Sequence, residues 1–355
     1  MKLAYLTAKT YPSTTADHAY VRFLAYAFSR TWDGPFELIV RKREGNELDG
    51  IPVRQTYAPR RLRTWWYFLW IPWYCLRHSK EGIVFFSNDL NLLCVAIFWK
   101  RILPVSIYIV SDWHELSEVW KDAFVACRSS LCICTTQQLA QNLAHATGTR
   151  KHIEVIYGGV DMGPFSLPLA RRSDLGLPED KVLIGYVGYF TTHGYEKGLF
   201  TLIEAMQYMD ADVHLVLVGA KGREIEDYVS YAEQRIPGRC HVIPAQPFAH
   251  AIAYQKAMDI LVIPYPDEPH FRKYGFPMKT YEYIAAGKPI IYSNLPILAE
   301  VLADIGIPFN PGDAKDLARA LAAGRTVNPT SLSDKNYYSW DAKAARISRT
   351  IVDCI

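Results

Sequence analysis

The chain has 355 residues, of which 50% are apolar and 21% are charged, and its formal net charge at pH 7 is +3. These values are close to globular averages and exclude a disordered or fibrous protein, while the length corresponds to about two domains. No apolar window approaches the ~18 residues of a transmembrane helix, and the apolar run Met1–Thr7 is too short for a signal peptide.

The distribution of cysteines and of charges along the chain gives two further predictions. The seven cysteines are scattered without a Cys-x-x-Cys pair, which predicts reduced thiols in a cytosolic protein rather than disulfides or a zinc site. Residues 1–157 carry 19 Lys and Arg against 13 Asp and Glu, a net charge of +6, together with eight of the nine tryptophans. The remainder has a net charge of −3, so the two halves are expected to meet different partners.

Short apolar runs rich in β-branched residues alternate with longer helical patterns along the whole chain. The runs are almost entirely apolar, as expected for parallel strands covered on both faces. In the first half the predicted strands are Leu3–Thr7, Phe36–Val40, Ile83–Ser87, Val105–Val110 and Leu131–Thr135. In the second half they are Val182–Val187, Val213–Val218, His241–Ile243, Ile260–Pro264 and Pro289–Ser293. Helical patterns such as Leu199–Met206, Ile225–Arg235 and Lys279–Ala286 fill the crossovers, which predicts two doubly wound α/β domains.

The boundary between the domains is expected at the adjacent glycines Gly158 and Gly159, which lead into Pro164 and Pro168. This divides the chain into a first domain, 1–157, and a second domain, 158–337. The C-terminal segment 338–355 reads as an amphipathic helix capped by Ser339 or Asp341, and we expect it to complete the first domain.

One candidate site follows the strand that ends at Val187. Gly188 lets the backbone turn sharply there, and Lys197 stands just before the next predicted helix. Because ligands of open α/β sheets collect beyond the carboxyl ends of the strands, the amides of that helix and the lysine would suit a phosphate. The alternative is an ordinary strand–turn–helix with a lysine on the surface.

A second candidate site precedes and begins the predicted helix 279–286. Pro277 suits the first helical position, so free amides from Gly275 to Lys279 would point out from a positive helix end. Lys279 and Glu282 lie on one helical face and could hold a phosphate and the ribose hydroxyls of a nucleotide. The alternative is a solvent-exposed ion pair, which contributes little.

These segments together resemble the retaining, nucleotide-sugar-dependent glycosyltransferases of the GT-B fold known as glycosyl transferases group one, or glycosyltransferase family four. Pro277–Pro289 looks like the family's Pro-x-Lys-x-x-Glu-Tyr-x-Ala-x-Gly-Lys-Pro segment, and Tyr157–Asp161 with Phe165 resembles its Asn-Gly-Val-Asp-x-x-x-Phe motif. Further matches are Glu196–Gly198, Leu202–Ala205, Val216–Gly219 and Ala257–Pro264. The resemblance implies a GT-B fold of two Rossmann-like domains facing a central cleft.

The resemblance also implies roles for single residues. Lys197 matches a lysine on the donor diphosphate, Glu282 matches the carboxylate that holds the ribose, and Lys279 would add charge for catalysis. Donor-binding positions implied by the matched segments are Gly188, Tyr189, Gly219, Tyr274, Gly275, Phe276, Pro277 and Met278, with the base near Ala245–Phe248. Tyr189 stands where many members carry an arginine, and Tyr274 stands where they carry a first glutamate. Arg272 and Lys273 are further candidates for the arginine's charge.

In the first domain, Asp112–Glu115 resembles the family's Asp-x-His-Glu segment, which implies that His114 faces the donor sugar. The alternative is a histidine that merely caps a strand end. Asp17 and His18 follow the first strand and open a predicted helix, where they could contact the acceptor hydroxyl or where Asp17 could simply cap the helix.

Residues 60–74 combine arginines with tryptophans and tyrosines, and Phe98–Arg101 repeats this chemistry on a smaller scale. Such a stretch is typical of a peripheral contact with an anionic lipid surface. The alternative is a core helix that covers the first sheet, and Pro72 interrupts a single amphipathic helix.

The sequence thus predicts a retaining hexosyltransferase that needs no metal or other cofactor and uses a nucleotide-diphosphate sugar. Its acceptor would be a glycan, a lipid-linked glycan or a small molecule in cell-surface polysaccharide or glycolipid synthesis. We expect a cytoplasmic enzyme, on the inner face of the membrane if residues 60–74 bind lipid, and no nucleic-acid partner. Two alternatives stay open: a catalytically inactive binding or assembly subunit, because of Tyr189 and Tyr274, and a sugar-nucleotide epimerase of the same fold.

Overall fold

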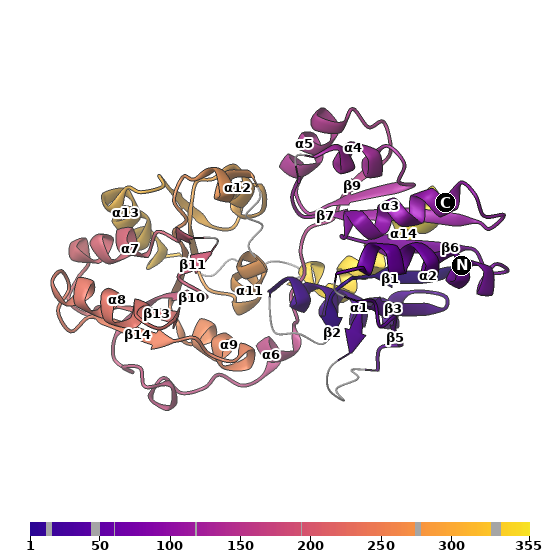
Figure 1. The fold of residues 1–355 in the computed structure, drawn as a ribbon. Coiled ribbons are helices and arrows are strands. Elements are labelled where there is room, and N and C mark those ends of the chain that lie inside the picture. Colours follow the sequence, from indigo (N-terminus) through magenta and orange to yellow (C-terminus); the bar gives the residue numbers. More distant parts are fainter. Residues whose placement is uncertain are drawn as a thin grey trace. The chain divides into compact units, whose positions relative to one another are not determined.

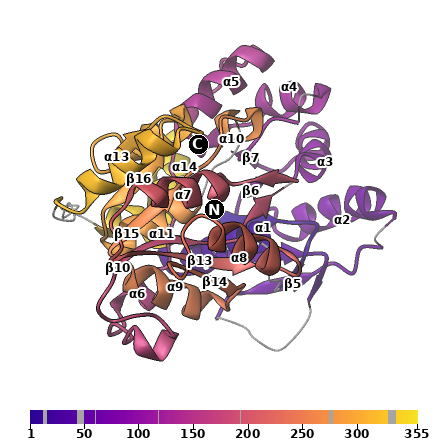
Figure 2. The ribbon, with the colours of Figure 1, turned by 90° about the vertical axis from the view of Figure 1, so that its left-hand side faces the viewer.

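The computed structural model describes residues 1–11, 16–43, 50–59, 61–117, 119–192, 194–273, 278–327 and 335–355, with the backbone alone at 16–19, 273 and 335. The chain forms two compact units, one of residues 1–159 and 337–355 and one of residues 160–336. The colours of Figures 1 and 2 trace this path: the first unit is indigo to magenta, the second is pink to gold, and the chain returns to the first unit in the C-terminal helix α14 (Trp340–Cys354).

The first unit is built on a parallel sheet with the strand order β5-β3-β1-β6-β7-β8-β9. Its strands are β1 (Lys2–Leu6), β3 (Phe36–Val40), β5 (Val53–Gln55), β6 (Ile83–Ser87), β7 (Ile107–Trp113), β8 (Leu131–Cys134) and β9 (Ile153–Val155). The short strands β2 (Thr10–Tyr11) and β4 (Lys42–Arg43) pair separately. The order reverses between β1 and β6, which is the pattern of a doubly wound sheet.

The helices of the first unit pack against this sheet, and side chains at their starts cap several of them. They are α1 (Ala16–Thr31), α2 (Arg63–Arg77), α3 (Leu90–Lys100), α4 (Trp120–Ala126), α5 (Gln137–Thr147) and α14. Asp89 and Thr136 cap α3 and α5 by accepting backbone N–H groups of the first turn. The 3₁₀ turn η3 (Lys335–Tyr338) leads to Ser339, whose hydroxyl accepts the Ala342 amide and caps α14. Of the two predicted caps Ser339 is therefore the one used.

The second unit repeats the architecture with the order β14-β13-β10-β15-β16-β17, again parallel throughout. Its strands are β10 (Val182–Val187), β13 (Val213–Ala220), β14 (Cys240–Pro244), β15 (Ile260–Ile263), β16 (Ile290–Ser293) and β17 (Ile307–Phe309), with the small antiparallel ribbon β11 (Thr191–Thr192) and β12 (Tyr195–Glu196). Its helices are α6 (Gly163–Ser166), α7 (Leu199–Ala205), α8 (Glu224–Glu233), α9 (Phe248–Ala257), α10 (Pro269–Lys273), α11 (Met278–Ala286), α12 (Pro296–Leu302), α13 (Ala314–Gly324) and the 3₁₀ turns η1 (Ser173–Leu175) and η2 (Met206–Tyr208).

The cores follow from the apolar runs in the sequence. Every residue of the central strands β1, β6 and β15 is buried, because helices cover both faces of each sheet. Burial of this apolar surface, at about 25 cal/mol per Å², is the main term that stabilises each unit. The cysteines are free thiols, as predicted, and those of the strands and of α2 are mostly buried. None of the described helices has the length and hydropathy needed to cross a bilayer.

Candidate functional site

In the second unit the strand order reverses at β10, which lies between β13 and β15. Gly188 directly follows β10 with φ +146°, and Gly219 near the end of β13 has φ +128°. A Cβ atom at Gly188 would collide with Nζ of Lys279, and one at Gly219 would collide with the carbonyl oxygen of Gly188. The two glycines therefore allow a close approach of the strand ends and leave space for Lys279 at the switch point, where such sheets bind ligands.

Lys279 lies on α11 and is 9% exposed. Its ammonium donates to the carbonyl oxygen of Val187 and lies 4.5 Å and 5.5 Å from the ring centroids of Tyr186 and Tyr283. Burial lowers the pKa of Lys279 to about 7, with help from the charge of Lys197 and against the opposing effect of Glu282. The interpretation of Lys279 and Glu282 as an exposed ion pair is wrong, because the lysine turns inward to the end of β10.

Lys197 connects β12 to α7 and is half-buried, with its backbone N–H bonded to the Phe190 carbonyl oxygen at 3.1 Å. Burial lowers the pKa of Lys197 to about 8; the charge of Lys221 acts in the same direction and that of Glu224 against it. Within the described part of the chain, neither Lys197 nor Lys279 has a carboxylate within 4 Å. Two ammonium groups that repel each other without a carboxylate partner form a site that a bound dianion would stabilise.

A third lysine, Lys221, which the sequence analysis missed, lies near enough to Lys197 to lower its pKa. Lys221 directly follows β13, and its ammonium lies 3.3 Å from the ring centroid of Tyr189, which is 51% exposed. Tyr189 thus lies against a cation at the position where the resemblance led us to expect an arginine. The signal was available: Lys221 comes two residues after Val216–Gly219, at the carboxyl end of a predicted strand.

The amides at the start of α7 are already occupied. The carboxylate of Glu196 accepts the backbone N–H groups of Gly198 at 2.7 Å and Leu199 at 2.6 Å, and it also accepts the Tyr228 hydroxyl at 2.9 Å. The expectation that this helix end offers free amides to a phosphate is therefore wrong for Gly198 and Leu199. The glutamate of the Glu-Lys-Gly segment caps the helix and so fixes the position of Lys197.

Glu282 lies one helical turn after Lys279. Its Oε2 accepts a hydrogen bond of 2.8 Å from Nε2 of Gln255, a buried residue of α9, while its Oε1 has no hydrogen-bond partner among the described residues. Met278 begins α11 and is half-buried. A carboxylate fixed through one oxygen with the other available could accept hydroxyl groups of a ligand.

Several predicted positions cannot be placed in this geometry. Tyr274, Gly275, Phe276 and Pro277 lie outside the described residues, and so does the side chain of Lys273. Arg272 is exposed and its guanidinium is paired with the carboxylate of Asp267. It is therefore already neutralised, unlike Lys197 and Lys279.

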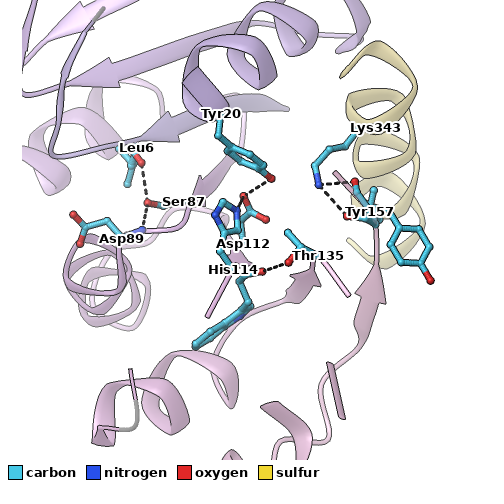
Figure 3. A network of polar contacts seen from close by, with 11 residues as sticks. Leu6, Tyr20, Ser87, Asp89, Asp112, His114, Thr135, Tyr157 and Lys343 are labelled. Atoms are coloured by element: carbon cyan, nitrogen blue, oxygen red, sulfur yellow. Dashed lines mark hydrogen bonds and ion pairs between the residues drawn. The ribbon is translucent and has the colours of Figure 1, made fainter. Parts of the chain in front are cut away.

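The first unit carries a separate polar network at the end of β7 (Figure 3). Asp112 is buried, and its Oδ2 accepts the Tyr20 hydroxyl at 3.0 Å and lies 3.1 Å from Nε2 of His114. The His114 side chain is 30% exposed and packs edge-on against the Tyr20 ring. From α14, Lys343 donates two bonds of 2.9 Å to the carbonyl oxygens of Ile156 and Tyr157. His114 is therefore part of an organised cluster and does more than cap a strand end.

The structure bears on one part of the prediction for Asp17 and His18, the position of Asp17 relative to the start of α1. α1 begins at Ala16, so Asp17 lies within the first helical turn and is not the residue before it, as a cap would be. The side chains of Asp17 and His18 lie outside the described residues.

Comparison with known sequences indicates the class of protein to which this geometry corresponds. Residues 181–323, which hold Lys197, Lys221, Lys279 and Glu282, match the family model of Glycosyl transferases group 1. The protein TuaH of Bacillus subtilis (strain 168), provisionally named a teichuronic acid biosynthesis glycosyltransferase, is 22% identical over 253 residues. This match covers 70% of the present chain, and the chain spans 59% of the length of TuaH.

Solved structures share the fold over nearly the whole chain. HepE of Anabaena, determined in complex with UDP, superposes with a TM-score of 0.76 at 17% identity and covers 99% of this chain and 100% of its own. Sucrose-phosphate synthase of Thermosynechococcus elongatus gives a TM-score of 0.73 at 19% identity, covering 99% and 98% of the two chains. These neighbours are GT-B glycosyltransferases with two Rossmann-like domains, so the predicted GT-B fold is confirmed.

Proposed function

We propose that the protein is a glycosyltransferase that moves a hexose-type sugar from a nucleotide-diphosphate donor to an acceptor hydroxyl with retention of configuration. The observation that carries this proposal is the pair Lys197 and Lys279 at the switch point of the second sheet, buried enough to lower both pKa values and without a carboxylate within 4 Å among the described residues. The match of residues 181–323 to the glycosyl transferase family model supports it.

The chemical task of the two lysines would be to stabilise the departing nucleoside diphosphate. As the bond from the sugar to the diphosphate breaks, negative charge develops on the leaving oxygen, and charges already fixed in a site of low polarity are worth most there. Charge-assisted hydrogen bonds from ammonium groups are roughly twice as strong as neutral ones. Because the lysines would supply this charge, we propose that transfer needs no metal ion, and activity should persist in the presence of EDTA.

The remaining donor contacts can be assigned by chemistry. The available Oε1 of Glu282 would accept the ribose hydroxyls, and Lys221 with Tyr189 would lie beside the phosphates. HepE was determined with UDP and also with UDP-glucose, which makes UDP-glucose the first donor to test. The name of TuaH supports an acceptor in cell-surface polysaccharide synthesis.

The test uses the purified protein with a panel of nucleotide sugars and candidate glycan acceptors. Released diphosphate together with a new glycoside supports transfer, and the anomeric configuration of that glycoside, read by NMR, decides between retention and inversion. A nucleotide sugar with an altered sugar would support an epimerase instead. Neither product from any donor would contradict the proposal and favour an inactive binding subunit.

We further propose that transfer takes place at the inner face of a membrane, through the outward face of α2. The helix has two apolar faces. Tyr67, Ile71, Tyr74 and Cys75 are fully buried in the core of the first unit. At about 100° per residue, an exposed apolar stripe lies on the opposite side of the helix. It consists of Leu62, Trp65, Trp66, Leu69, Trp73 and Leu76.

The end of α3 extends this stripe. Nε1 of Trp99 donates to the carbonyl oxygen of Phe68 at 2.8 Å, which fixes the two helices to each other, and Phe98 and Ile102 are exposed beside them. Segments 61–80 and 90–102 contain six lysines and arginines and no aspartate or glutamate. The buried face of α2 fits the core-helix interpretation, and the exposed face is the one that a lipid contact would use.

An exposed face with tryptophans, leucines and only positive charge is suited to the headgroup region of an anionic bilayer. Each basic side chain near such a surface contributes about 1 kcal/mol. The five exposed cations Arg61, Arg63, Arg77, Lys80 and Arg101, with tryptophans inserted into the headgroup region, would therefore give reversible binding that salt weakens. Arg60, which the sequence places in the same basic cluster, lies outside the described residues.

Co-sedimentation with vesicles of anionic or neutral lipid, at low and high salt, tests this part of the proposal. Wild type should sediment with anionic vesicles at low salt, whereas a Trp65→Ser/Leu69→Ser/Trp73→Ser variant should stay in solution. Trp120→Ser is the matched control, because Trp120 is an exposed tryptophan on another helix of the same unit. Equal recovery of all three proteins in the supernatant would contradict a lipid contact and favour a soluble acceptor.

A further inference from the structure

Asp112 has features that a purely structural residue does not need. It is an aspartate at the carboxyl end of β7, its side chain is completely buried, and its Oδ1 has no hydrogen-bond partner among the described residues. Burying a carboxylate oxygen without a hydrogen-bond partner lowers the stability of the fold. Such a group suggests a role other than stabilising the fold. The residue that this carboxylate contacts is His114.

The contact fixes which nitrogen of His114 faces outward. Nε2 is directed at Oδ2 of Asp112, 3.1 Å away, and the edge-on packing of the Tyr20 ring, with its centroid 4.3 Å from that of His114, limits rotation of the imidazole. Nδ1 has no hydrogen-bond partner in the part of the chain that the structure describes, and the side chain is partly exposed. In the neutral ring, a proton held on Nε2 by the carboxylate makes Nδ1 a hydrogen-bond acceptor.

Several neighbouring groups stabilise the ionised form of Asp112. Burial acts to raise the pKa of Asp112, but His114, Lys343 and the hydroxyl of Tyr20 together hold it below its usual value. Asp112 in turn raises the pKa of Tyr5 on β1 and of Cys134 on β8, adding to the larger effect of their burial. The carboxylate is therefore ionised at neutral pH and acts only as an acceptor.

We propose that Asp112 is a positioning residue, which holds His114 with its proton on Nε2 and so presents Nδ1 as a hydrogen-bond acceptor to a hydroxyl group of a sugar bound at the first unit. This inference rests on the proposed function for the identity of the ligand, whereas the tautomer itself does not depend on it. The same relation of a buried carboxylate to an imidazole fixes the tautomer of catalytic histidines in hydrolases.

The deciding variant is Asp112→Leu, because it keeps the approximate shape of the side chain and removes the oxygen that holds the Nε2 proton. The neutral ring should then divide between its two tautomers, so that Nδ1 is no longer held as an acceptor for the sugar. Labelling histidines with ¹⁵N and recording the ring-nitrogen resonances at neutral pH reads this tautomer directly, with His114→Gln to assign the signal. We expect the single tautomer to give way to a mixture, kcat to fall tenfold or more, and KM for the donor to change little.

Glu37→Gln is the matched control in the same unit. Glu37 is also a half-buried carboxylate that accepts a tyrosine hydroxyl, from Tyr74 at 2.9 Å, and pairs with Arg54 at 2.8 Å. This variant should lower stability without changing the His114 resonances or kcat. Asp112→Glu, which restores a carboxylate, should return the wild-type tautomer and part of the rate.

The outcomes separate the inference from the proposed function. A His114 ring that keeps its single tautomer in Asp112→Leu overturns the positioning role, whatever happens to the rate. A mixture of tautomers with unchanged kcat overturns the contact between Nδ1 and the sugar. If wild type transfers no sugar from any donor, the proposed function fails while the tautomer measurement still decides what Asp112 does.

Discussion

The buried lysine of the second unit gives a prediction that can be worked through in numbers. Lys279 has a pKa of about 7 in the free protein, because it is buried and lies near Lys197, whose own pKa is about 8. A diphosphate bound between them would favour the ammonium form of both. The complex would then hold more protons than the free protein, so donor affinity is highest at low pH and falls as the pH rises through 7 and 8.

The size of this effect follows from the fraction of each lysine that is protonated. Between pH 6 and pH 9 a group with a pKa of about 7 passes from almost fully protonated to about 1% protonated, which weakens binding about 100-fold. The pKa of about 8 for Lys197 adds a further factor of about 10. The dissociation constant should therefore rise by about three orders of magnitude.

Isothermal titration with UDP-glucose across this range is the assay, because the diphosphate diester of a nucleotide sugar does not itself titrate there. Repeating the titration in buffers of different ionisation enthalpy counts the protons taken up on binding. Lys279→Met keeps the apolar stem and removes the charge, so it should bind more weakly at pH 6 and show only the roughly tenfold pH dependence of Lys197. An affinity that is flat in wild type from pH 6 to pH 9 would refute the reasoning.

Three further substitutions test the site. Lys197→Ala should lower kcat roughly 10²- to 10³-fold at an unchanged melting temperature, because it removes a charge from the leaving group; wild-type turnover would exclude this role. Glu282→Ala should raise KM for the donor about tenfold at unchanged kcat, since ribose contacts are made equally in ground and transition states, and a loss confined to kcat would contradict the assignment. Gly219→Ala should lower the free energy of unfolding by more than the ~1–2 kcal/mol of backbone strain, because its Cβ would collide with the backbone carbonyl of Gly188. Gly194→Ala, at φ +82° with no atom of the described residues within 4 Å of its Cβ beyond its chain neighbours, is the control that carries the strain alone, and equal losses in the two variants would argue against the close approach.

The sequence predicted the long buried strands and helices well, because an entirely apolar run in an α/β protein is usually a central strand that helices cover on both faces. Phe36–Val40, Ile83–Ser87 and Val182–Val187 match the structure residue for residue. The three-residue strands β5, β9 and β17 were missed, since so short a run carries no period. β7 extends to Trp113, three residues past its predicted end, because Ser111 and Asp112 are polar residues buried by partners that only the fold provides.

The candidate site was less accessible to sequence reasoning. A motif can indicate that Lys279 and Glu282 share a helical face, but not that Lys279 turns inward to Val187 while Glu282 bonds Gln255. The use of Glu196 as the cap of α7 and the contact of Lys221 with Tyr189 likewise join residues from different elements. Such contacts depend on how strands and helices pack in three dimensions, which local spacing does not encode.

The central claim is that Lys197 and Lys279 together hold the diphosphate of a nucleotide sugar at the carboxyl end of β10. A crystal structure of the protein with UDP-glucose tests it most directly. The account predicts the two phosphates within hydrogen-bond distance of both ammonium groups, with the ribose hydroxyls at Glu282. A nucleotide bound elsewhere in the second unit, or phosphates that contact neither lysine, would contradict it.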